Sequence, residues 1–212
     1  MLKVKVCGMK YDENIDALSC LPIDYMGFIC YPKSPRYIGE NNKPLEDKLQ
    51  QFDSSIKRVG VFVNASQDEI EKAVEQYQFD VVQLHGGESP SFCKQIQQFI
   101  PVVKAFSIEK EIDLEVTAEY EETCNYFLFD TKTSAFGGSG RKFDWKLLEA
   151  YSGSTPFLLS GGIGLDDASQ IKELKHPLLL GVDLNSRFEV EPGLKNRNQL
   201  ETFIKQLNDE SN

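Results

Sequence analysis

The sequence predicts an α/β fold in which eight parallel strands close into one (β/α)8 barrel, the TIM barrel architecture. Short runs of β-branched or aromatic residues alternate with longer polar stretches that have helical periodicity. Eight such runs in 212 residues give about one per 26 residues, close to the roughly 30 residues of a βα unit. No break in composition divides the chain, so residues 1–212 are expected to form a single domain. An open, doubly wound sheet is the alternative, but it would leave edges that closure removes.

The expected strands are apolar runs bounded by turn residues. They are residues 3–7, 25–30, 58–63, 80–84, 102–107, 126–130, 156–160 and 178–182. The clearest helix covers residues 67–77, where Ile70, Val74 and Tyr77 share one face, and Ser66 and Glu69 have the spacing of a capping box. Further helices are expected at residues 10–20, 42–54, 89–98, 111–122, 144–151, 166–174 and 197–207.

Composition and charge exclude several classes of protein. With 41% hydrophobic and 26% charged residues, disorder, collagen and coiled coil are excluded. No apolar run is long enough to cross a membrane, and lysines interrupt the first residues, so we expect a cytoplasmic protein without a secretory signal. A net charge of −10 without a basic run argues against nucleic acid and membranes as partners. The five cysteines show no CxxC spacing and are expected to be free thiols.

In a barrel of this kind, the residues that follow each strand face the active site. This rule reduces the chain to a short set of candidates. They are Cys7, the loop 31–36, Asn64, His85, Phe106, Asp130, the pair Gly161 and Gly162, and Asp183.

Two of these candidates have side chains suited to proton transfer. Cys7 ends the first strand, and its thiol is equally well explained as a packing residue or as a base. An unperturbed thiol is only about 3% ionised at pH 7, so a role as base requires help from the site. Asp130 follows the aromatic run 126–129, which could exclude water from the carboxylate and raise its pKa, so that it donates a proton at neutral pH. Its alternatives are a helix cap or an ion pair.

Other candidates suit an anionic substrate. Gly161 and Gly162 follow the seventh strand, and Asp183, Asn185 and Ser186 follow the eighth, where barrels build phosphate sites from backbone N–H groups. The two segments together favour a phosphorylated ligand.

Arg36 lies in a proline-stiffened loop and could bind a carboxylate or phosphate, since it is one of few basic residues expected at the mouth of a chain with a net charge of −10; a solvated surface arginine is the alternative. His85 could be a lining, structural or catalytic residue. The glycine-rich stretch 131–142 is long for a βα loop and could be a lid or merely a flexible loop.

Short segments along the chain, taken in order, closely resemble those of one protein family. The matching pieces are residues 5–8, 27–28, 34–37, 59–64, 83–86, Asp130 with 137–140 and 143–145, 160–162, 181–183, Glu189, 192–193 and Lys195. They span residues 5–195, nearly the whole chain, and resemble the phosphoribosylanthranilate isomerases of tryptophan biosynthesis. Arg187 departs from the family pattern, which often has glycine after the serine.

The resemblance implies an Amadori rearrangement of N-(5′-phosphoribosyl)anthranilate to the carboxyphenylamino-deoxyribulose phosphate, with no metal or organic cofactor. By similarity, Asp130 is the general acid and Cys7 the general base. Arg36 would bind the anthranilate carboxylate, and Gly161, Gly162, Asn185 and Ser186 would bind the phosphate. Asp183 would contact the ribose or order the site. The expected partner is the small phosphosugar substrate, and the chain is a monomer or a homodimer.

Rival functions remain open from the residues alone. The histidine-pathway isomerase performs the same type of rearrangement but is expected to use aspartates as both acid and base, which Cys7 argues against. A metal-dependent epimerase would need more histidines than the two in this chain, and indole-glycerol-phosphate synthase fits the length less well. A barrel that only binds a phosphorylated metabolite would not need Cys7 and Asp130 together.

Overall fold

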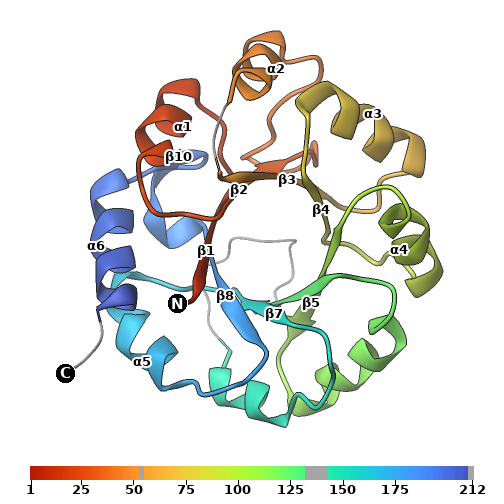
Figure 1. Ribbon diagram of the computed structural model, residues 1–212, viewed down its shortest axis with the longest axis vertical. Coiled ribbons are helices and arrows are strands. Elements are labelled where there is room, and N and C mark those ends of the chain that lie inside the picture. Colours follow the sequence, from red (N-terminus) through yellow and green to blue (C-terminus); the bar gives the residue numbers. More distant parts are fainter. Residues whose placement is uncertain (53–54, 132–142, 210–212) are drawn as a thin grey trace.

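The fold is a closed barrel of eight parallel strands, seen in a computed structural model that describes residues 1–52, 55–131 and 143–209. Each strand pairs with the next, and the eighth pairs with the first, with Lys5 opposite Asp183. Figure 1 shows the ring of strands surrounded by helices. The strands are β1 (Lys3–Cys7), β2 (Tyr25–Ile29), β3 (Lys57–Phe62), β4 (Val81–Leu84), β5 (Val102–Ile108), β6 (Tyr126–Thr131), β7 (Phe157–Leu159) and β8 (Leu179–Leu184). The barrel prediction is confirmed, and the open sheet is excluded.

The α-helices of the outer layer follow the expected order. They are α1 (Asp12–Ser19), α2 (Lys43–Gln50), α3 (Gln67–Tyr77), α4 (Pro90–Gln97), α5 (Ala168–Glu173) and α6 (Arg197–Asn208). The helix expected at 67–77 has the predicted bounds, and its capping box is present. Among the described residues, no helix has the length and apolarity that crossing a membrane requires.

Two segments expected to be α-helices are 3₁₀ helices instead. They are η1 (Glu111–Tyr120) and η2 (Trp145–Ala150). In η1, Glu111, Glu115 and Glu119 recur at a spacing of four, where an α-helix would stack like charges on one face. This repulsion disfavours the α-helix, which the apolar pattern alone had predicted.

Further short elements follow β7 and β8. A 3₁₀ helix η3 (Leu165–Asp167) precedes α5, and a second one, η4 (Ser186–Phe188), follows β8. A small antiparallel hairpin of β9 (Glu189–Glu191) and β10 (Leu194–Lys195) then leads into α6. The sequence analysis did not predict this hairpin.

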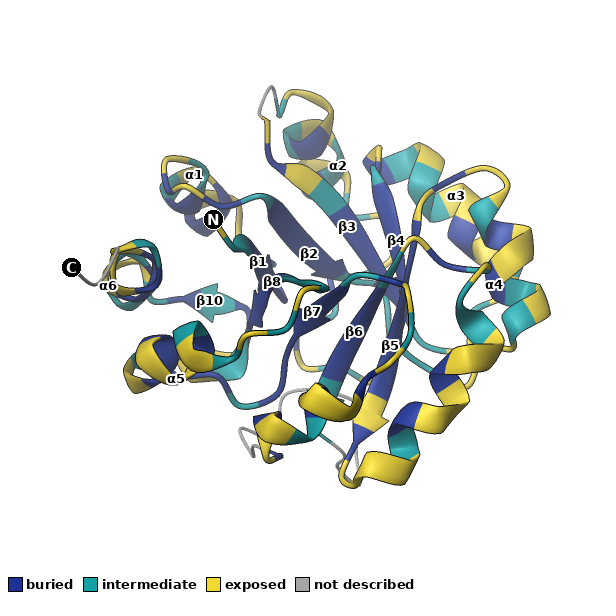
Figure 2. Ribbon diagram, turned by 60° about the horizontal axis from the view of Figure 1, so that its bottom comes forward, coloured by how far each residue is buried: buried dark blue, intermediate teal, exposed yellow. Residues whose placement is uncertain are grey.

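The barrel separates two apolar layers. The larger layer lies between the strands and the helices, and Figure 2 shows buried strands beneath helices whose outer faces are exposed. The smaller layer fills the barrel interior with residues such as Val61, Val81 and Leu128. Lys5 and Gln83 are also buried, each 1% exposed. The interior therefore contains polar groups that are able to act on side chains at the strand ends.

Loss of the Ser66 cap is expected to weaken α3. The Ser66 Oγ accepts a hydrogen bond from the Glu69 N–H, and the Ser66 N–H donates to the Glu69 carboxylate over 2.8 Å. Ser66→Ala should lower the free energy of unfolding by about 1 kcal/mol, measured by urea denaturation. Ser152→Ala is the control, because that serine is exposed and has no side-chain hydrogen bond within the described residues. Equal losses in the two variants would contradict the capping role.

Candidate active site

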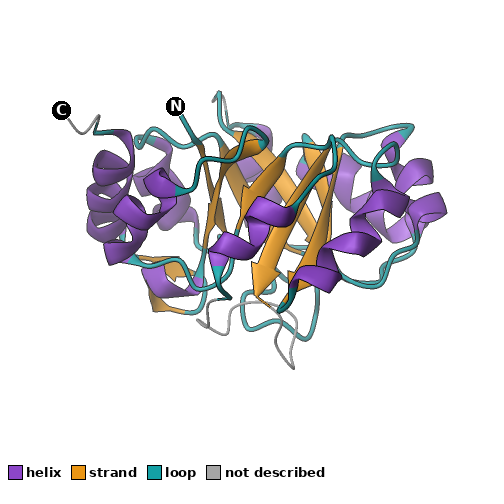
Figure 3. Ribbon diagram, turned by 90° about the horizontal axis from the view of Figure 1, so that it is seen from below, coloured by secondary structure: helices purple, strands orange, loops and turns teal. Residues whose placement is uncertain are grey.

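Alternation along the strands brings the predicted acid and base to one end of the barrel. The eight barrel strands are parallel and end on the same side, opposite the N-terminus (Figure 3). Cys7 follows Lys5 on the inward face of β1, and Asp130 follows the interior residue Leu128 on β6. His85 follows the inward Gln83 just beyond β4. We call this end of the barrel the mouth.

Cys7 is buried beside a lysine. The thiol is next to Gly27 of the neighbouring strand, where a Cβ would lie 2.8 Å from Cys7 Sγ and 3.2 Å from Lys5 Nζ. A side chain at position 27 would therefore displace both groups. Burial raises the pKa of the Cys7 thiol above its ordinary value, although the Lys5 ammonium opposes the shift. The free site thus holds a neutral thiol at pH 7 with a cation close to it.

Asp183 orders the floor of the mouth through a buried ion pair. Its Oδ1 accepts a hydrogen bond from Lys5 Nζ over 2.7 Å, and its Oδ2 accepts one from the Ser160 hydroxyl over 3.2 Å. Burial would lower the pKa of Lys5, but Asp183 and Cys7 together outweigh burial, through their charges and hydrogen bonds, and raise it. The ammonium beside Cys7 therefore stays charged.

Asp130 lies at the mouth between β6 and His85. Its Oδ1 accepts the Thr131 N–H over 2.7 Å, and its Oδ2 lies 3.4 Å from His85 Nε2. The expected aromatic wall is wrong: Phe127 and Phe129 belong to the layer between strands and helices, because alternation points them away from Asp130. The side chain of Asp130 is 14% exposed, so its environment is set by the mouth and not by those rings.

Arg36 is buried and not a solvated surface residue. Its Nε and Nη2 form a fork on the Glu189 carboxylate at distances of 2.6 to 3.1 Å. Lys195 Nζ contacts the same carboxylate over 2.6 Å and Asn185 Oδ1 over 2.8 Å. Burial would raise the pKa of Glu189, but the hydrogen bonds from Arg36 and the charge of Lys195 lower it.

The two predicted phosphate segments have the backbone that close approach requires. Gly161 and Gly162 have φ of 90° and 69°, in the left-handed region that favours glycine. A Cβ on Gly161 would lie 2.3 Å from Thr131 Oγ1. Ser186 begins η4 directly after Asn185. Arg187 is not among the described residues with positive φ, so this position does not require glycine.

The Arg187 side chain turns toward the glycine loop. Its Nε lies 3.3 Å from where a Cβ on Gly164 would be. The departure from the family pattern therefore adds a cation beside the predicted phosphate segments.

The predicted lid falls almost wholly outside the described residues. Residues 132–142, with the glycines 137–140, are not described. The flanking residues Thr131 and Phe143 are joined, since the Phe143 N–H donates to Thr131 Oγ1 over 3.2 Å. The two ends of the segment therefore meet beside Asp130.

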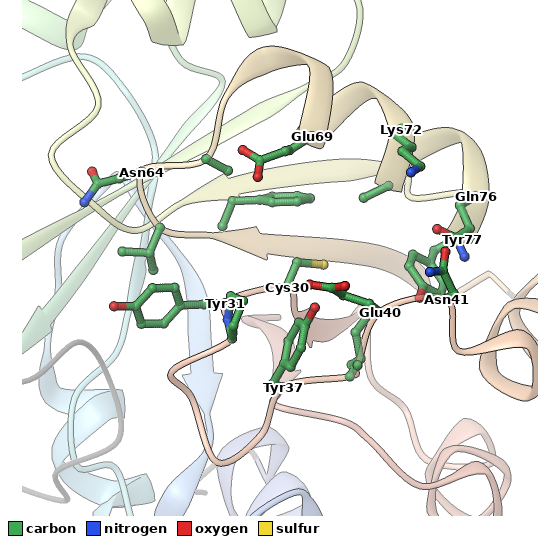
Figure 4. A pocket seen from close by; sticks show the side chains of 17 residues that line it. Cys30, Tyr31, Tyr37, Glu40, Asn41, Asn64, Glu69, Lys72, Gln76 and Tyr77 are labelled. Carbon is green, nitrogen blue, oxygen red and sulfur yellow. The ribbon is translucent and has the colours of Figure 1, made fainter.

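The remaining candidates lie apart from this cluster. A cavity of about 390 Å³ between the loop after β2 and α3 is lined by Tyr31, Tyr37, Asn64, Glu69 and Tyr77 among others (Figure 4). Phe106 packs in the outer layer against Tyr120 and Phe127. Neither Cys7 nor Asp130 lines that cavity.

The structure adds four polar residues to the site that had no assigned role. They are Lys5, Gln83, Glu189 and Lys195. Lys5 and Gln83 stand two residues before Cys7 and His85, so strand alternation was a usable signal for them. Glu189 and Lys195 come from the unpredicted hairpin, and only the family resemblance had singled them out.

The chain is similar to phosphoribosylanthranilate isomerases in both sequence and structure. The family model described as N-(5′-phosphoribosyl)anthranilate (PRA) isomerase matches residues 4–206. The isomerase of that name from Parabacteroides distasonis is 45% identical over 206 residues, covering 96% of this chain and 92% of the relative.

Two solved structures have the same architecture. A phosphoribosyl anthranilate isomerase in complex with reduced 1-(o-carboxyphenylamino)-1-deoxyribulose 5-phosphate superposes with a TM-score of 0.85 at 31% identity, covering 98% of both chains. Monomers generated from the dimeric isomerase of Thermotoga maritima give a TM-score of 0.81 at 32% identity, again covering 98% of each chain.

Proposed function

Because this chain belongs to the phosphoribosylanthranilate isomerase family and catalyses that isomerisation in tryptophan biosynthesis, we propose that Asp130 is its general acid and Cys7 its general base. One observation carries this proposal: the thiol of Cys7, the last residue of β1, and the carboxyl group of Asp130, the penultimate residue of β6, lie on the inward face at one mouth. The rates of the Asp130→Asn and Cys7→Ser variants test the two roles.

The proposed reaction needs one proton donated and one removed. Asp130 gives its proton to the ring oxygen of the phosphoribosyl group, so the C–O bond breaks and the nitrogen lone pair forms a cationic Schiff base. The cation acidifies the C–H bond at the neighbouring sugar carbon. Cys7 then takes that proton, and the electron pair of the C–H bond neutralises the nitrogen as the enolamine forms. The enolamine tautomerises to the ketone product.

The charges around Cys7 favour its thiolate form when substrate is bound. Among the described residues, the buried cations Lys5, Arg36 and Lys195 face only the two carboxylates Asp183 and Glu189. The excess positive charge suits an anion in the mouth, either a thiolate or a group of the substrate. The raised pKa of Cys7 disfavours ionisation in the free site, so the cations and the Schiff base are the groups that assist it.

Arg36 is proposed to bind the anthranilate carboxylate. Glu189 occupies Nε and one side of Nη2, and among the described residues no hydrogen bond reaches Nη1. The guanidinium is therefore held in place with one edge left for a second carboxylate.

Arg36→Ala is expected to raise KM about tenfold or more, because it removes a charge-assisted hydrogen bond to substrate. Steady-state kinetics measure the effect. Arg58→Ala is the matched control. Arg58 forms a similar fork on Asp80, with Nε to Oδ2 at 2.9 Å, but it lies at the start of β3, at the end of the barrel away from the mouth. This variant should lose stability and keep its KM. An unchanged KM in Arg36→Ala would contradict the assigned role.

The phosphate is proposed to lie between the β7 and β8 loops. Gly161 and Gly162 let backbone approach an anion, and Asn185 and Ser186 offer polar groups from the other side. Arg187 supplies a cation near the same loop. We further propose a cytoplasmic location and either a monomer or a homodimer, the relative from T. maritima being described as dimeric.

A further inference from the structure

Gln83 is a buried amide inside the barrel whose side chain, among the described residues, hydrogen-bonds only to a histidine. Its side chain is 1% exposed on the inward face of β4. Its Nε2 lies 2.8 Å from His85 Nδ1, and its Oε1 has no hydrogen-bond partner in the described part of the chain. Burying an amide without hydrogen bonds to all of its polar atoms costs free energy of folding, so the single hydrogen bond of Gln83 calls for an explanation.

His85 connects this amide to the proposed acid. One ring nitrogen faces Gln83, and the other, Nε2, lies 3.4 Å from Asp130 Oδ2. The side chains of His85 and Asp130 are 15% and 14% exposed, so both are largely shielded from water. The three residues form a chain that runs from the barrel interior to the mouth.

The two orientations of the Gln83 amide predict opposite proton positions on His85. If Nε2 of Gln83 donates to Nδ1, the imidazole carries its proton on Nε2 and donates it toward Asp130. If the amide is reversed, Nδ1 carries the proton, and both N–H groups of the buried amide are left without a partner among the described residues. Buried orphan N–H groups are rarer than under-satisfied carbonyl oxygens. The first orientation is therefore favoured.

The backbone beside His85 is fixed from outside the barrel. Lys104 Nζ donates to the Gly86 carbonyl over 2.8 Å and pairs with the Glu88 carboxylate over 3.2 Å. Glu88 in turn accepts the Gly86 N–H over 2.9 Å. Lys104 and Glu88 are both buried, so this clamp restricts the loop that carries the imidazole.

We propose that Gln83 is a positioning residue that keeps the His85 proton on Nε2, where it is donated to Asp130 Oδ2. This inference rests on the proposed role of Asp130. Oδ2 is able to accept this hydrogen bond in either protonation state, but the bond strengthens when Asp130 becomes a carboxylate. The contact therefore stabilises the acid most after it has given its proton to the substrate.

Nitrogen NMR of the imidazole rings tests the proton position directly. The chain has only two histidines, and His176 is an internal reference. Its Nε2 lies 3.0 Å from the Tyr151 carbonyl and its Nδ1 accepts the Leu178 N–H, which requires a proton on Nε2. His176→Gln identifies which signals belong to His85. We expect the His85 ring to show the same Nε2–H pattern as His176 at neutral pH, and an Nδ1–H or doubly protonated ring would overturn the proposal.

Gln83→Glu tests the cause of this proton position with a side chain of the same shape. A carboxylate only accepts hydrogen bonds, so it should move a proton to His85 Nδ1 and lower kcat about tenfold with little change in KM. Retention of the Nε2–H pattern or of full kcat would overturn the proposal.

The failure of this inference is distinguishable from failure of the proposed function. An Nδ1–H ring in a protein whose Asp130→Asn variant is inactive removes only the role of Gln83. Full activity of Asp130→Asn removes the acid itself, whatever the ring shows.

Discussion

Asp130→Asn is expected to lower kcat by about 10²- to 10⁴-fold, the range that a positioned general acid contributes. Asparagine has the same shape, and its own Oδ1 is able to accept the hydrogen bond that the Thr131 N–H now donates to Asp130 Oδ1, so the fold should persist. It has no acidic proton for the ring oxygen of the substrate, so the C–O bond of the furanose should not open at an appreciable rate. Stopped-flow or steady-state kinetics at saturating substrate measure the effect. A thermal melt of the same sample shows whether the variant is folded.

Asp144→Asn is the matched control for this variant. Asp144 caps η2, accepting the Lys146 N–H over 3.1 Å, and asparagine is an equally good cap. Its kcat should equal that of the unaltered protein. Near-normal turnover in Asp130→Asn would show that another group protonates the ring oxygen.

Cys7→Ser is expected to lower kcat by orders of magnitude, again within about 10² to 10⁴. A hydroxyl fits the site next to Gly27, but it ionises far less readily than a thiol and is a poor base. The affinity for substrate should change little, because Cys7 acts on the C–H bond only after the ring has opened. Separate measurement of kcat and KM in the two proteins distinguishes these effects.

The pH dependence of the unaltered protein is a second readout of Cys7. Because burial raises the pKa of this thiol, the thiolate fraction of the free protein increases with pH above neutrality. The value of kcat/KM should therefore rise with pH on the alkaline side, and this rise should vanish in Cys7→Ser. Cys20→Ser controls for the substitution itself, since Cys20 is exposed and should be neutral. Equal rates in Cys7→Ser and Cys20→Ser would contradict the role of base.

Strands and their order could be predicted from sequence because each is a short apolar run between turn residues. The expected strand 3–7 and the expected helix 67–77 have the observed bounds, and Ser66 supplies the capping box that fixes the start of α3. η1 was predicted as an α-helix because the prediction considered only the apolar pattern. It did not take into account the repulsion between glutamates four residues apart. The hairpin of β9 and β10 is too short for either periodicity to appear.

The positions of the candidate site residues could be predicted where they follow from the strand ends. The side chains with which these residues form hydrogen bonds and ion pairs could not. Cys7, Asp130, His85 and Asp183 lie at the mouth because alternation and barrel closure dictate it. The fork between Arg36 and Glu189 joins residues 153 apart in sequence, a pairing that no local pattern encodes. For the same reason, the effect of Lys5 on Cys7 and of Gln83 on His85 becomes visible only when the barrel is closed.

Family membership also decides among the rival functions. The residues alone left the histidine-pathway isomerase and a non-catalytic barrel open. The matched family model and the relatives at 45% and 43% identity carry the name of the tryptophan-pathway isomerase. The roles of Cys7 and Asp130 stay predictions until the two variants are measured.

The central claim is that this barrel isomerises phosphoribosylanthranilate with its own acid and base. The most direct test follows the fluorescence of freshly generated phosphoribosylanthranilate after adding the purified protein in the presence of EDTA. We expect rapid loss of the anthranilate-type emission, proportional to protein concentration. No loss of emission from protein shown by circular dichroism to be folded would contradict the claim.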